Sequence, residues 1–380
     1  MKITIVGGGP AGLYFSILVK KSFPDADITI FERNGPNDTF GWGVVFSGRT
    51  LKELEENDLP SYQSILEQFE TWDNVDVVHR DEKVTIGGNH FNGISRLTML
   101  QLLQARAEAL KVRIHYHSEI QDIVQFQDSD IVLIADGVNS FLRKKFAAHF
   151  QPKISVRTNK YIWYGTTKLF HGLTLTFREN DHGIFAAHSY KFSKTHSTFV
   201  VECDEDTWRR AGLDTMNEEE YRHYIEKVFE HDLEGHSLLS NRSVWINFQL
   251  IKCAHWVHDN MVIVGDAAHT AHFSIGSGTK LALEDVIALA NELKKTSSVA
   301  TALANYEADR RPVVEDLQAA AQQSLVLFEN LGDVIDLSPL EMAYRMMTRS
   351  GRIDDERIKK RDPEFMERLL AERSTPQNVW

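Results

Sequence analysis

The chain has little cysteine, no long apolar run and no cluster of basic residues. Its 380 residues include only two cysteines, Cys203 and Cys253, which excludes a disulfide framework or a cysteine-rich zinc site and suits a reducing compartment. No apolar run approaches the roughly 18 residues of a membrane-spanning helix, and residues 1–6 have a strand pattern where a secretory signal would stand. We therefore expect a cytoplasmic protein without a membrane partner.

Charge and histidine spacing exclude two further kinds of ligand. The net charge is −12, and no long run of lysine and arginine interrupts the acidic balance, which argues against nucleic acid as a partner. The sixteen histidines show no metal-ligand spacing, so we expect no metal site. The chain is long enough for a large core and two interleaved domains.

A glycine-rich sequence follows the first predicted strand. Lys2–Val6 is apolar and β-branched, and Gly7, Gly9 and Gly12 then fit the pattern G-x-G-x-x-G. These glycines allow a tight turn, close approach of a pyrophosphate, and close packing of helix on strand. The helix expected from about Ala11 to Lys21 directs its free N–H groups at the phosphates. A glycine-rich turn in another α/β fold is the alternative.

A carboxylate after the second predicted strand supports the nucleotide interpretation. Ile28–Phe31 ends in Glu32, twenty residues after Gly12, where an acid accepts hydrogen bonds from both ribose hydroxyls. A second motif, Gly265-Asp266, follows the strand Met261–Val264. Asp266 is suited to the ribityl hydroxyls of FAD, and the helix starting near Gly278 directs its N–H groups at the flavin ring. A simple helix N-cap is the alternative for Asp266.

Two more features lie between these motifs. The strand Asp130–Ala135 leads into Asp136-Gly137, which resembles the Asp-Gly motif of flavoprotein aromatic hydroxylases. Arg96 opens a predicted helix, where that family often has an arginine near the FAD pyrophosphate; an ordinary surface arginine is the alternative. A second dinucleotide fingerprint is missing, so NAD(P)H is expected to bind transiently.

The middle of the chain has a strand pattern instead of alternating strands and helices. Short aromatic and β-branched runs between residues 161 and 204 predict an antiparallel sheet. Pro312 is expected to start or kink a helix within residues 300–331. We expect an α/β fold: a Rossmann-like FAD-binding domain (residues 1–74, 96–155 and 257–331) interleaved with an antiparallel substrate domain (156–256), which inserted strands at 75–95 join, and a helical tail (332–380).

With these motifs in place, the chain resembles class A flavoprotein monooxygenases of the para-hydroxybenzoate hydroxylase fold over nearly its full length. Phe40–Ser47, Asn159–Thr166 and His269–Thr279 are similar to a narrower branch. That branch hydroxylates aryl-CoA thioesters, such as salicylyl-CoA and 2-aminobenzoyl-CoA, or tryptophan in violacein synthesis. Many class A hydroxylases have two prolines where this chain has His272-Phe273, although the narrower branch shares His-Phe.

The resemblance implies an enzyme. NAD(P)H reduces FAD, O2 adds at flavin C4a as a hydroperoxide, and one oxygen atom passes to an electron-rich aromatic ring, here of an aryl-CoA thioester. The alternatives are a hydroxylase of a free indole or tryptophan-like intermediate and a non-catalytic flavin-binding protein. A flavin-dependent halogenase is disfavoured because Trp245-Ile246-Asn247-Phe248 does not match its Trp-x-Trp-x-Ile-Pro motif. A monomer or a homodimer is expected, and no second, ring-reducing activity.

The resemblance also suggests site residues. His272 and Phe273 are the catalytic and substrate-binding candidates beside the flavin, together with Tyr161 and Trp163 on one face of the sheet; a loop histidine bonded to backbone and packing aromatics are the alternatives. Basic residues of the tail either meet CoA phosphates or form a solvated helix face: Arg349, Arg352, Lys359, Lys360 and Arg361. The cofactor-binding candidates are Gly7, Gly9, Pro10, Ala11, Gly12, Glu32, Arg33, Gly41, Arg96, Asp136, Gly137, Gly265, Asp266, Gly276, Gly278 and Thr279.

Overall fold

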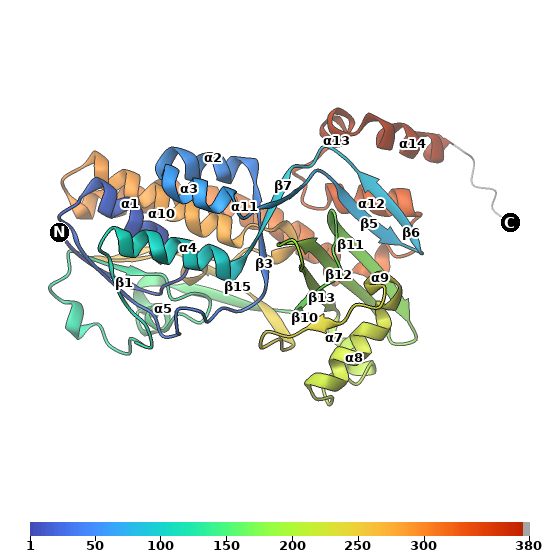
Figure 1. Cartoon of the computed structure of the whole chain (residues 1–380), viewed down its shortest axis with the longest axis horizontal. Coiled ribbons are helices and arrows are strands. Elements are labelled where there is room, and N and C mark those ends of the chain that lie inside the picture. Colours follow the sequence, from blue (N-terminus) through green and yellow to red (C-terminus); the bar gives the residue numbers. More distant parts are fainter. Residues whose placement is uncertain (375–380) are drawn as a thin grey trace.

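A six-stranded sheet carries the two nucleotide motifs (Figure 1). The computed structural model describes residues 1–374. All neighbouring strands of this sheet are parallel except the edge pair β16–β17. The carboxyl ends of the central strands therefore meet at one edge, where open α/β sheets bind ligands. In order across the sheet the strands are β16 (Val257–His258), β17 (Met261–Ile263), β9 (Ile131–Ile134), β1 (Lys2–Val6), β2 (Asp27–Phe31) and β8 (Arg113–His115).

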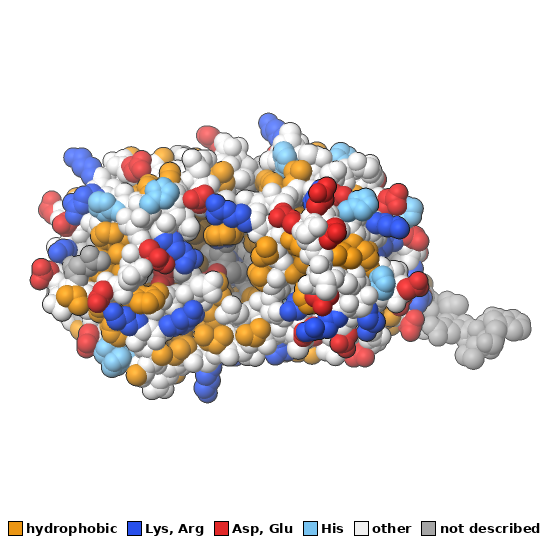
Figure 2. Space-filling view, turned by 90° about the horizontal axis from the view of Figure 1, so that it is seen from below, with side chains coloured by type: hydrophobic (Ala, Val, Ile, Leu, Met, Phe, Trp, Pro, Cys, Tyr) orange, Lys and Arg blue, Asp and Glu red, His pale blue; other side chains and the backbone are white. Residues whose placement is uncertain are grey.

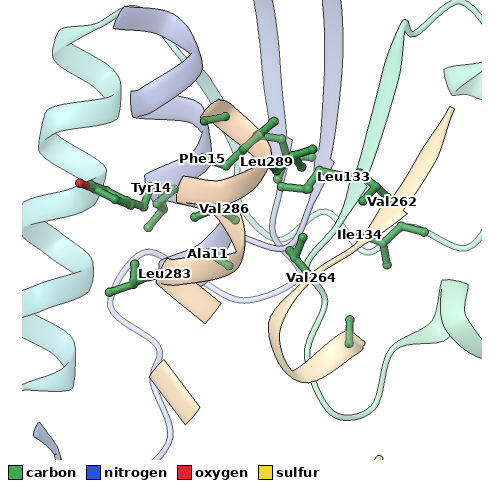
Figure 3. Packing of buried hydrophobic residues seen from close by; sticks show 14 of the residues in the cluster. Ala11, Tyr14, Phe15, Leu133, Ile134, Val262, Val264, Leu283, Val286 and Leu289 are labelled. Atoms are coloured by element: carbon green, nitrogen blue, oxygen red, sulfur yellow. The ribbon is translucent and has the colours of Figure 1, made fainter. Parts of the chain in front are cut away.

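Helices cover this sheet with apolar side chains. Helix α1 (Pro10–Ser22) begins with a proline, which suits the first helical position because its missing N–H would have no helical partner there. It packs against α10 (Gly278–Lys295) and the sheet, and Figure 3 shows Phe15 and Leu289 meeting Leu133 there. The other helices of this part are α2 (Gly48–Asn57), α3 (Leu59–Leu66), α4 (Arg96–Ala109), α5 (Phe141–Lys145) and α6 (Ala147–Phe150).

The second large sheet has eight strands and confirms the expected fold class. It is antiparallel except for one pair, β5–β11, which is parallel and differs from the expectation. Strand β10 also begins earlier than expected, because its first residues form an exposed ribbon with β15 and lack an apolar pattern. The strands are β14 (Leu238–Leu239), β10 (Pro152–Thr166), β13 (Ser197–Cys203), β12 (Gly183–Lys191), β11 (Leu173–Asn180), β5 (Val75–His79), β6 (Glu82–Ile86) and β15 (Ile246–Cys253).

The two faces of this sheet have different roles. Ile162 and Tyr164 of β10 are buried against a helical layer, whereas Tyr161 and Trp163 point to the opposite face and are only partly buried. Because side chains alternate along a strand, these two aromatics share the face that looks toward the first part of the molecule. The helical layer consists of α7 (Glu205–Arg210), α8 (Glu218–Val228) and α9 (Glu230–Leu233).

Reciprocal packing of indole on glycine locks the two parts together. A side-chain carbon on Gly165 of β10 would lie 2.5 Å from the ring of Trp42, and one on Gly41 would lie 2.5 Å from the ring of Trp163. Gly43 adds two hydrogen bonds, from its N–H to Thr198 Oγ1 at 3.0 Å and from the Tyr190 hydroxyl to its carbonyl at 2.8 Å. A small third sheet starts here, made of β3 (Gly43–Ser47), β7 (Phe91–Ser95) and β4 (Glu70–Trp72).

The C-terminal helices cover the β5–β6 hairpin (Figure 1). Helix α11 (Val299–Glu329) runs through Pro312, so the expected helix start there is wrong. Pro312 is exposed, while Arg310 before it and Val314 after it are buried, and this packing holds the helix across the missing hydrogen bond. The tail continues as α12 (Pro339–Thr348), α13 (Asp355–Arg361) and α14 (Pro363–Ser374). None of the helices within residues 1–374 is long and apolar enough to cross a bilayer.

The Gly165 contact predicts a stability effect. We expect Gly165→Ala to lower the free energy of unfolding by about 1–3 kcal/mol, because the new methyl group overlaps the Trp42 ring. Urea denaturation followed by tryptophan fluorescence measures this change. Gly332→Ala is the matched control, since no atom lies within 4 Å of its added carbon. Equal stability of the two variants would contradict the close packing of Trp42 on Gly165.

Candidate functional site

Three loops meet at the carboxyl edge of the six-stranded sheet. Gly7 follows β1, Asp136 follows β9, and Gly265 opens the 3-10 turn η2 (Gly265–Ala267) after β17. Parallel pairing keeps the loops adjacent, as shown by the hydrogen bond from Ala135 N–H to the Val6 carbonyl at 2.8 Å. The sequence motifs predicted separately are thus neighbours in space.

The glycines of the first loop divide into packing and open positions. Gly7 has φ of +110°, and an added carbon would lie 2.2 Å from the Ala135 carbonyl; on Gly12 it would lie 2.1 Å from the Gly7 carbonyl. Any larger residue at these two positions displaces backbone. Gly9 has no atom within 4 Å of such a carbon, so its backbone at the start of α1 borders open space suited to a phosphate. The same openness is found at Gly137, Gly276 and Gly278.

Glu32 is held in place at the end of β2. Its Oε2 accepts a hydrogen bond from Gly8 N–H at 2.7 Å, and its Oε1 accepts from the Asn34 backbone and side-chain amides at 2.8 Å each. The carboxylate is half-buried beside the glycine loop, and Oε2, which has a single donor, retains a lone pair for a further one. Arg33 next to it is exposed.

A buried arginine joins the second and third loops. Arg143 has no exposed surface, and its guanidinium donates to the Val138 carbonyl at 2.6 Å and to the Ala267 carbonyl at 3.0 Å. It therefore fixes the loop after β9 against the loop after β17. Asp136 accepts from Phe141 N–H at 2.9 Å through Oδ2, while its buried Oδ1 has no hydrogen-bond partner among the described residues.

Asp266 and Arg96 are close enough for each to influence the ionisation of the other. Asp266 keeps exposed surface, yet the surrounding protein raises the pKa of its carboxyl, with the charge of Arg96 as the strongest opposing influence. Burial likewise lowers the pKa of Arg96, against the influence of Asp266, and its buried Nε has no partner among the described residues. Figure 2 shows the underside of the molecule hollowed between its two halves.

These features fit an FAD. Arg96 Nε and Asp136 Oδ1, which lack hydrogen-bond partners among the described residues, lie with Asp266 beside glycine backbone that borders open space, and this set matches the polar groups of a dinucleotide and its ribityl chain.

A second buried group supports the Gly265 loop and was missed from sequence. Asp285 of α10 accepts from Gly265 N–H at 2.9 Å and lies 2.6 Å from His269 Nε2, and Arg310 donates to it at 2.8 Å. Burial alone would raise the pKa of Asp285, but His269 and Arg310 hold it below its usual value. The sequence shows His269 shortly after Asp266, but it gives no sign that His269 contacts Asp285 on α10.

The predicted substrate residues form a partly apolar wall. The rings of Tyr161 and Phe273 are 4.7 Å apart, and both are half-buried. Trp163 lies against Gly41, so both of these residues take part in joining the halves. His272 is only 3 % exposed and lies behind Phe273, with its Nδ1 2.8 Å from Ser274 Oγ.

Two residues beside this wall were not anticipated. Glu202 of β13 and His188 of β12 are buried on the same face as Tyr161, with His188 Nε2 2.9 Å from Glu202 Oε1. A charged residue inside the apolar run 198–203 was the only signal in the sequence.

The basic tail residues do not form one surface. Arg349 points inward and donates to the Ser274 carbonyl at 2.6 Å, which neither interpretation of the tail anticipated. Arg352 is paired with Asp316, and Arg361 donates to Asn89 Oδ1 at 2.8 Å, whereas Lys359 and Lys360 are exposed. Gly276 lies in the loop before α10, and Gly278 and Thr279 begin that helix.

Comparison with known proteins defines the class. Residues 1–321 match the family described as FAD binding domain, and the chain belongs to this family. It is 41 % identical to salicyloyl-CoA 5-hydroxylase of a Streptomyces species, over 97 % of this chain and 73 % of that protein. It is 35 % identical to protodeoxyviolaceinate monooxygenase of Chromobacterium violaceum, over 90 % and 92 %. It is 34 % identical to 3-hydroxy-4-methyl-anthranilyl-[aryl-carrier protein] 5-monooxygenase of Streptosporangium sibiricum, over 93 % and 95 %.

Solved structures agree on the fold. The p-nitrophenol 4-monooxygenase PnpA of Pseudomonas putida superposes with a TM-score of 0.74 at 15 % identity, covering 97 % of this chain and 96 % of that one. A 2-methyl-3-hydroxypyridine-5-carboxylic acid oxygenase gives 0.68 at 19 % identity, covering 95 % and 97 %. The predicted class is confirmed: the protein is an FAD-dependent aromatic monooxygenase, which acts on an aromatic substrate with O2 and with NAD(P)H as the reductant typical of its family.

Asp266 is expected to govern cofactor retention. Asp266→Ala removes the exposed acid of the turn Gly265–Ala267 and should lose most of the bound FAD on gel filtration. The ratio of flavin absorbance to protein absorbance measures this, with the exposed Asp25→Ala as control. Stoichiometric FAD in the Asp266 variant would overturn the assignment.

His272 is expected to make stability depend on pH. Burial lowers its pKa from 6.5 to about 4, so between these values the unfolded chain binds a proton that the folded chain does not. The stabilisation is complete above pH 6.5 and is lost as the pH falls through 4, by on the order of 3 kcal/mol. Urea denaturation at about pH 7.5 and 4.5 should therefore show a smaller loss for His272→Gln than for wild type or for the surface control His223→Gln. Equal losses in all three would contradict the buried neutral imidazole.

Proposed function

We propose that this protein hydroxylates the aromatic ring of an aryl-CoA thioester of the salicyloyl or 2-aminobenzoyl type. The observation that carries the proposal is the 41 % identity to salicyloyl-CoA 5-hydroxylase over 97 % of the chain. A second relative, whose name specifies an anthranilyl group on a carrier protein, supports a ring bound through its carboxyl group.

In this proposal the two halves of the site divide the work. Bound FAD supplies an oxygen atom, derived from O2, in an electrophilic form. Asp266 and Arg96 hold the cofactor's polar groups, and the N-terminus of α10 favours negative charge on the ring system. Tyr161 and Phe273 flank the aromatic ring of the substrate and exclude water, which limits loss of the oxygen as peroxide.

We assign Tyr161 the part of a hydrogen-bond donor. Its hydroxyl is protonated at neutral pH, and burial, with Asp266 and Glu202 adding to the effect, raises its pKa from 10.0 to about 12, so it stays a donor at alkaline pH as well. The hydroxyl is available to an oxygen of the substrate.

The alternative substrate is a free indole or tryptophan-like intermediate. The 35 % identity to protodeoxyviolaceinate monooxygenase over 90 % of the chain favours it, and it predicts activity without a thioester.

Paired substrates separate the two proposals. The purified FAD-loaded protein is incubated with NAD(P)H, O2 and either salicyloyl-CoA or 2-aminobenzoyl-CoA, and with the matching free acids. We expect mass spectrometry to show the gain of one oxygen atom on a thioester only. NAD(P)H oxidised to peroxide with no product from any of these compounds would overturn the aryl-CoA proposal and direct the search to indoles.

A further inference from the structure

A buried carboxyl group lies between two imidazoles behind the substrate wall. Glu202 is 1 % exposed, and its Oε1 is 2.9 Å from His188 Nε2. Its Oε2 is 3.8 Å from His272 Nε2 and has no hydrogen-bond partner among the described residues. Burying a carboxyl oxygen without a partner is costly, so such a group is a candidate for function as well as packing.

A chain of hydrogen bonds determines which nitrogen of His272 carries the proton. Arg349 Nε donates to Ser324 Oγ at 3.0 Å, Ser324 Oγ is 2.8 Å from Ser274 Oγ, and Ser274 Oγ is 2.8 Å from His272 Nδ1. The backbone N–H of Ser274 also donates to His272 Nδ1, at 3.4 Å, so this nitrogen accepts. The proton of neutral His272 is therefore on Nε2, facing Glu202.

The same reasoning leaves His188 with a free basic nitrogen. A carboxylate accepts hydrogen bonds, so the His188 Nε2 that contacts Glu202 carries the proton. Its Nδ1 then holds a lone pair, and no described residue donates to it. A carboxylate that orients an imidazole through one nitrogen leaves the other nitrogen as a base.

His188 also lies next to the aromatic wall. Its ring meets Phe273 edge-on at 5.4 Å, and Phe273 is 4.7 Å from Tyr161. The other candidates for a base are less suitable, because burial raises the pKa of Tyr161 to about 12 and lowers that of His272 to about 4.

We propose that His188, oriented by Glu202, is the catalytic base that accepts the proton of the ring hydroxyl or amino group of the aromatic substrate. This inference rests on the proposed function. On binding, the O–H bond of a ring hydroxyl breaks and a bond from hydrogen to Nδ1 of His188 forms. The N–H bond of a ring amino group breaks in the same way as the ring carbon bonds to oxygen. When the ring regains aromaticity, its carbon releases a proton to the new oxygen, and His188 returns its own to the substituent, so the base ends unchanged. NAD(P)H supplies two electrons, one oxygen atom of O2 enters the ring, and the other leaves as water.

Several elements place charged or titratable groups around His188. Glu202 on β13 lies against it directly, His272 lies across the same carboxyl group, and Tyr161 on β10 shares the sheet face. Arg349 after α12 and Arg157 on β10 act on the network through His272.

Ionisation of the bound ligand tests the proposal without relying on turnover. Salicyloyl-CoA is titrated with pH while bound to FAD-loaded protein, and its phenolate is followed by ultraviolet difference spectroscopy. We expect wild type to bind the ring hydroxyl in its ionised form at a pH where the free ligand is protonated. His188→Gln keeps a hydrogen-bond donor to Glu202 but has no basic nitrogen. It should raise the pKa of the bound ring hydroxyl by about one unit or more. It should also lower kcat on the order of 100-fold with little change in KM.

A second variant and a control complete the test. Glu202→Gln should also raise the pKa of the bound ring hydroxyl, and this variant replaces His188→Gln if that protein does not fold. The control is His223→Gln, an exposed position on α8, which should match wild type. Wild-type ionisation and kcat in either folded variant of the pair would overturn the role of His188 and leave the proposed function intact. A wild-type protein that leaves both salicyloyl-CoA and 2-aminobenzoyl-CoA unmodified would overturn both, because neither a ring hydroxyl nor a ring amino group of an aryl-CoA thioester would then be its target.

Discussion

The part of the molecule built on the six-stranded sheet depends on the hydrogen bonds that Arg143 donates to two backbone carbonyls. Its buried guanidinium joins the loops after β9 and β17, and no water competes for its hydrogen bonds there. Asp285 holds the second of these loops from behind through Gly265. Two loops far apart in sequence thus become one rigid edge, and Asp266 at this edge keeps an exposed carboxyl group. Rigid support of this kind is what a site needs to hold its ligand in one orientation.

The second constraint is the interlock between the halves. Trp42 lies on Gly165 and Trp163 lies on Gly41, so each half supplies an indole and a glycine surface to the other. Large flat rings on bare backbone exclude water over a wide area and allow little sliding. The aromatic wall on the eight-stranded sheet is therefore held at a set position relative to the cofactor edge, and Trp163 serves this packing whether or not it also meets a substrate.

The sequence alone predicted the features that depend on local patterns. Gly7, Glu32 and Asp266 follow strands in a known order, so the cofactor, the class of reaction and the α/β fold were all within reach. His188 and Glu202 were not, because they become neighbours only through the pairing of β12 with β13, and register is a tertiary property. Pro312 shows the same limit. A proline predicts a helix start, but burial of Arg310 and Val314 on either side keeps α11 continuous through it. The inward direction of Arg349 could not be read from its exposed-looking basic neighbourhood.

The polar network behind the wall suggests why the site tolerates a buried acid. Glu202 lies between two imidazoles: His188 is hydrogen-bonded to one of its oxygens, and His272 Nε2 is 3.8 Å from the other. On its far side His272 contacts two serine hydroxyls that lead to Arg349, so a positive charge lies beyond the imidazole that faces the acid. Each imidazole directs a proton at Glu202, and this arrangement lowers the cost of burying the carboxylate. An apolar wall of Phe273 and Tyr161 in front then keeps water from breaking these contacts. The same arrangement that lowers the cost of burying Glu202 thus presents a basic nitrogen of His188 beside the ring-binding surface.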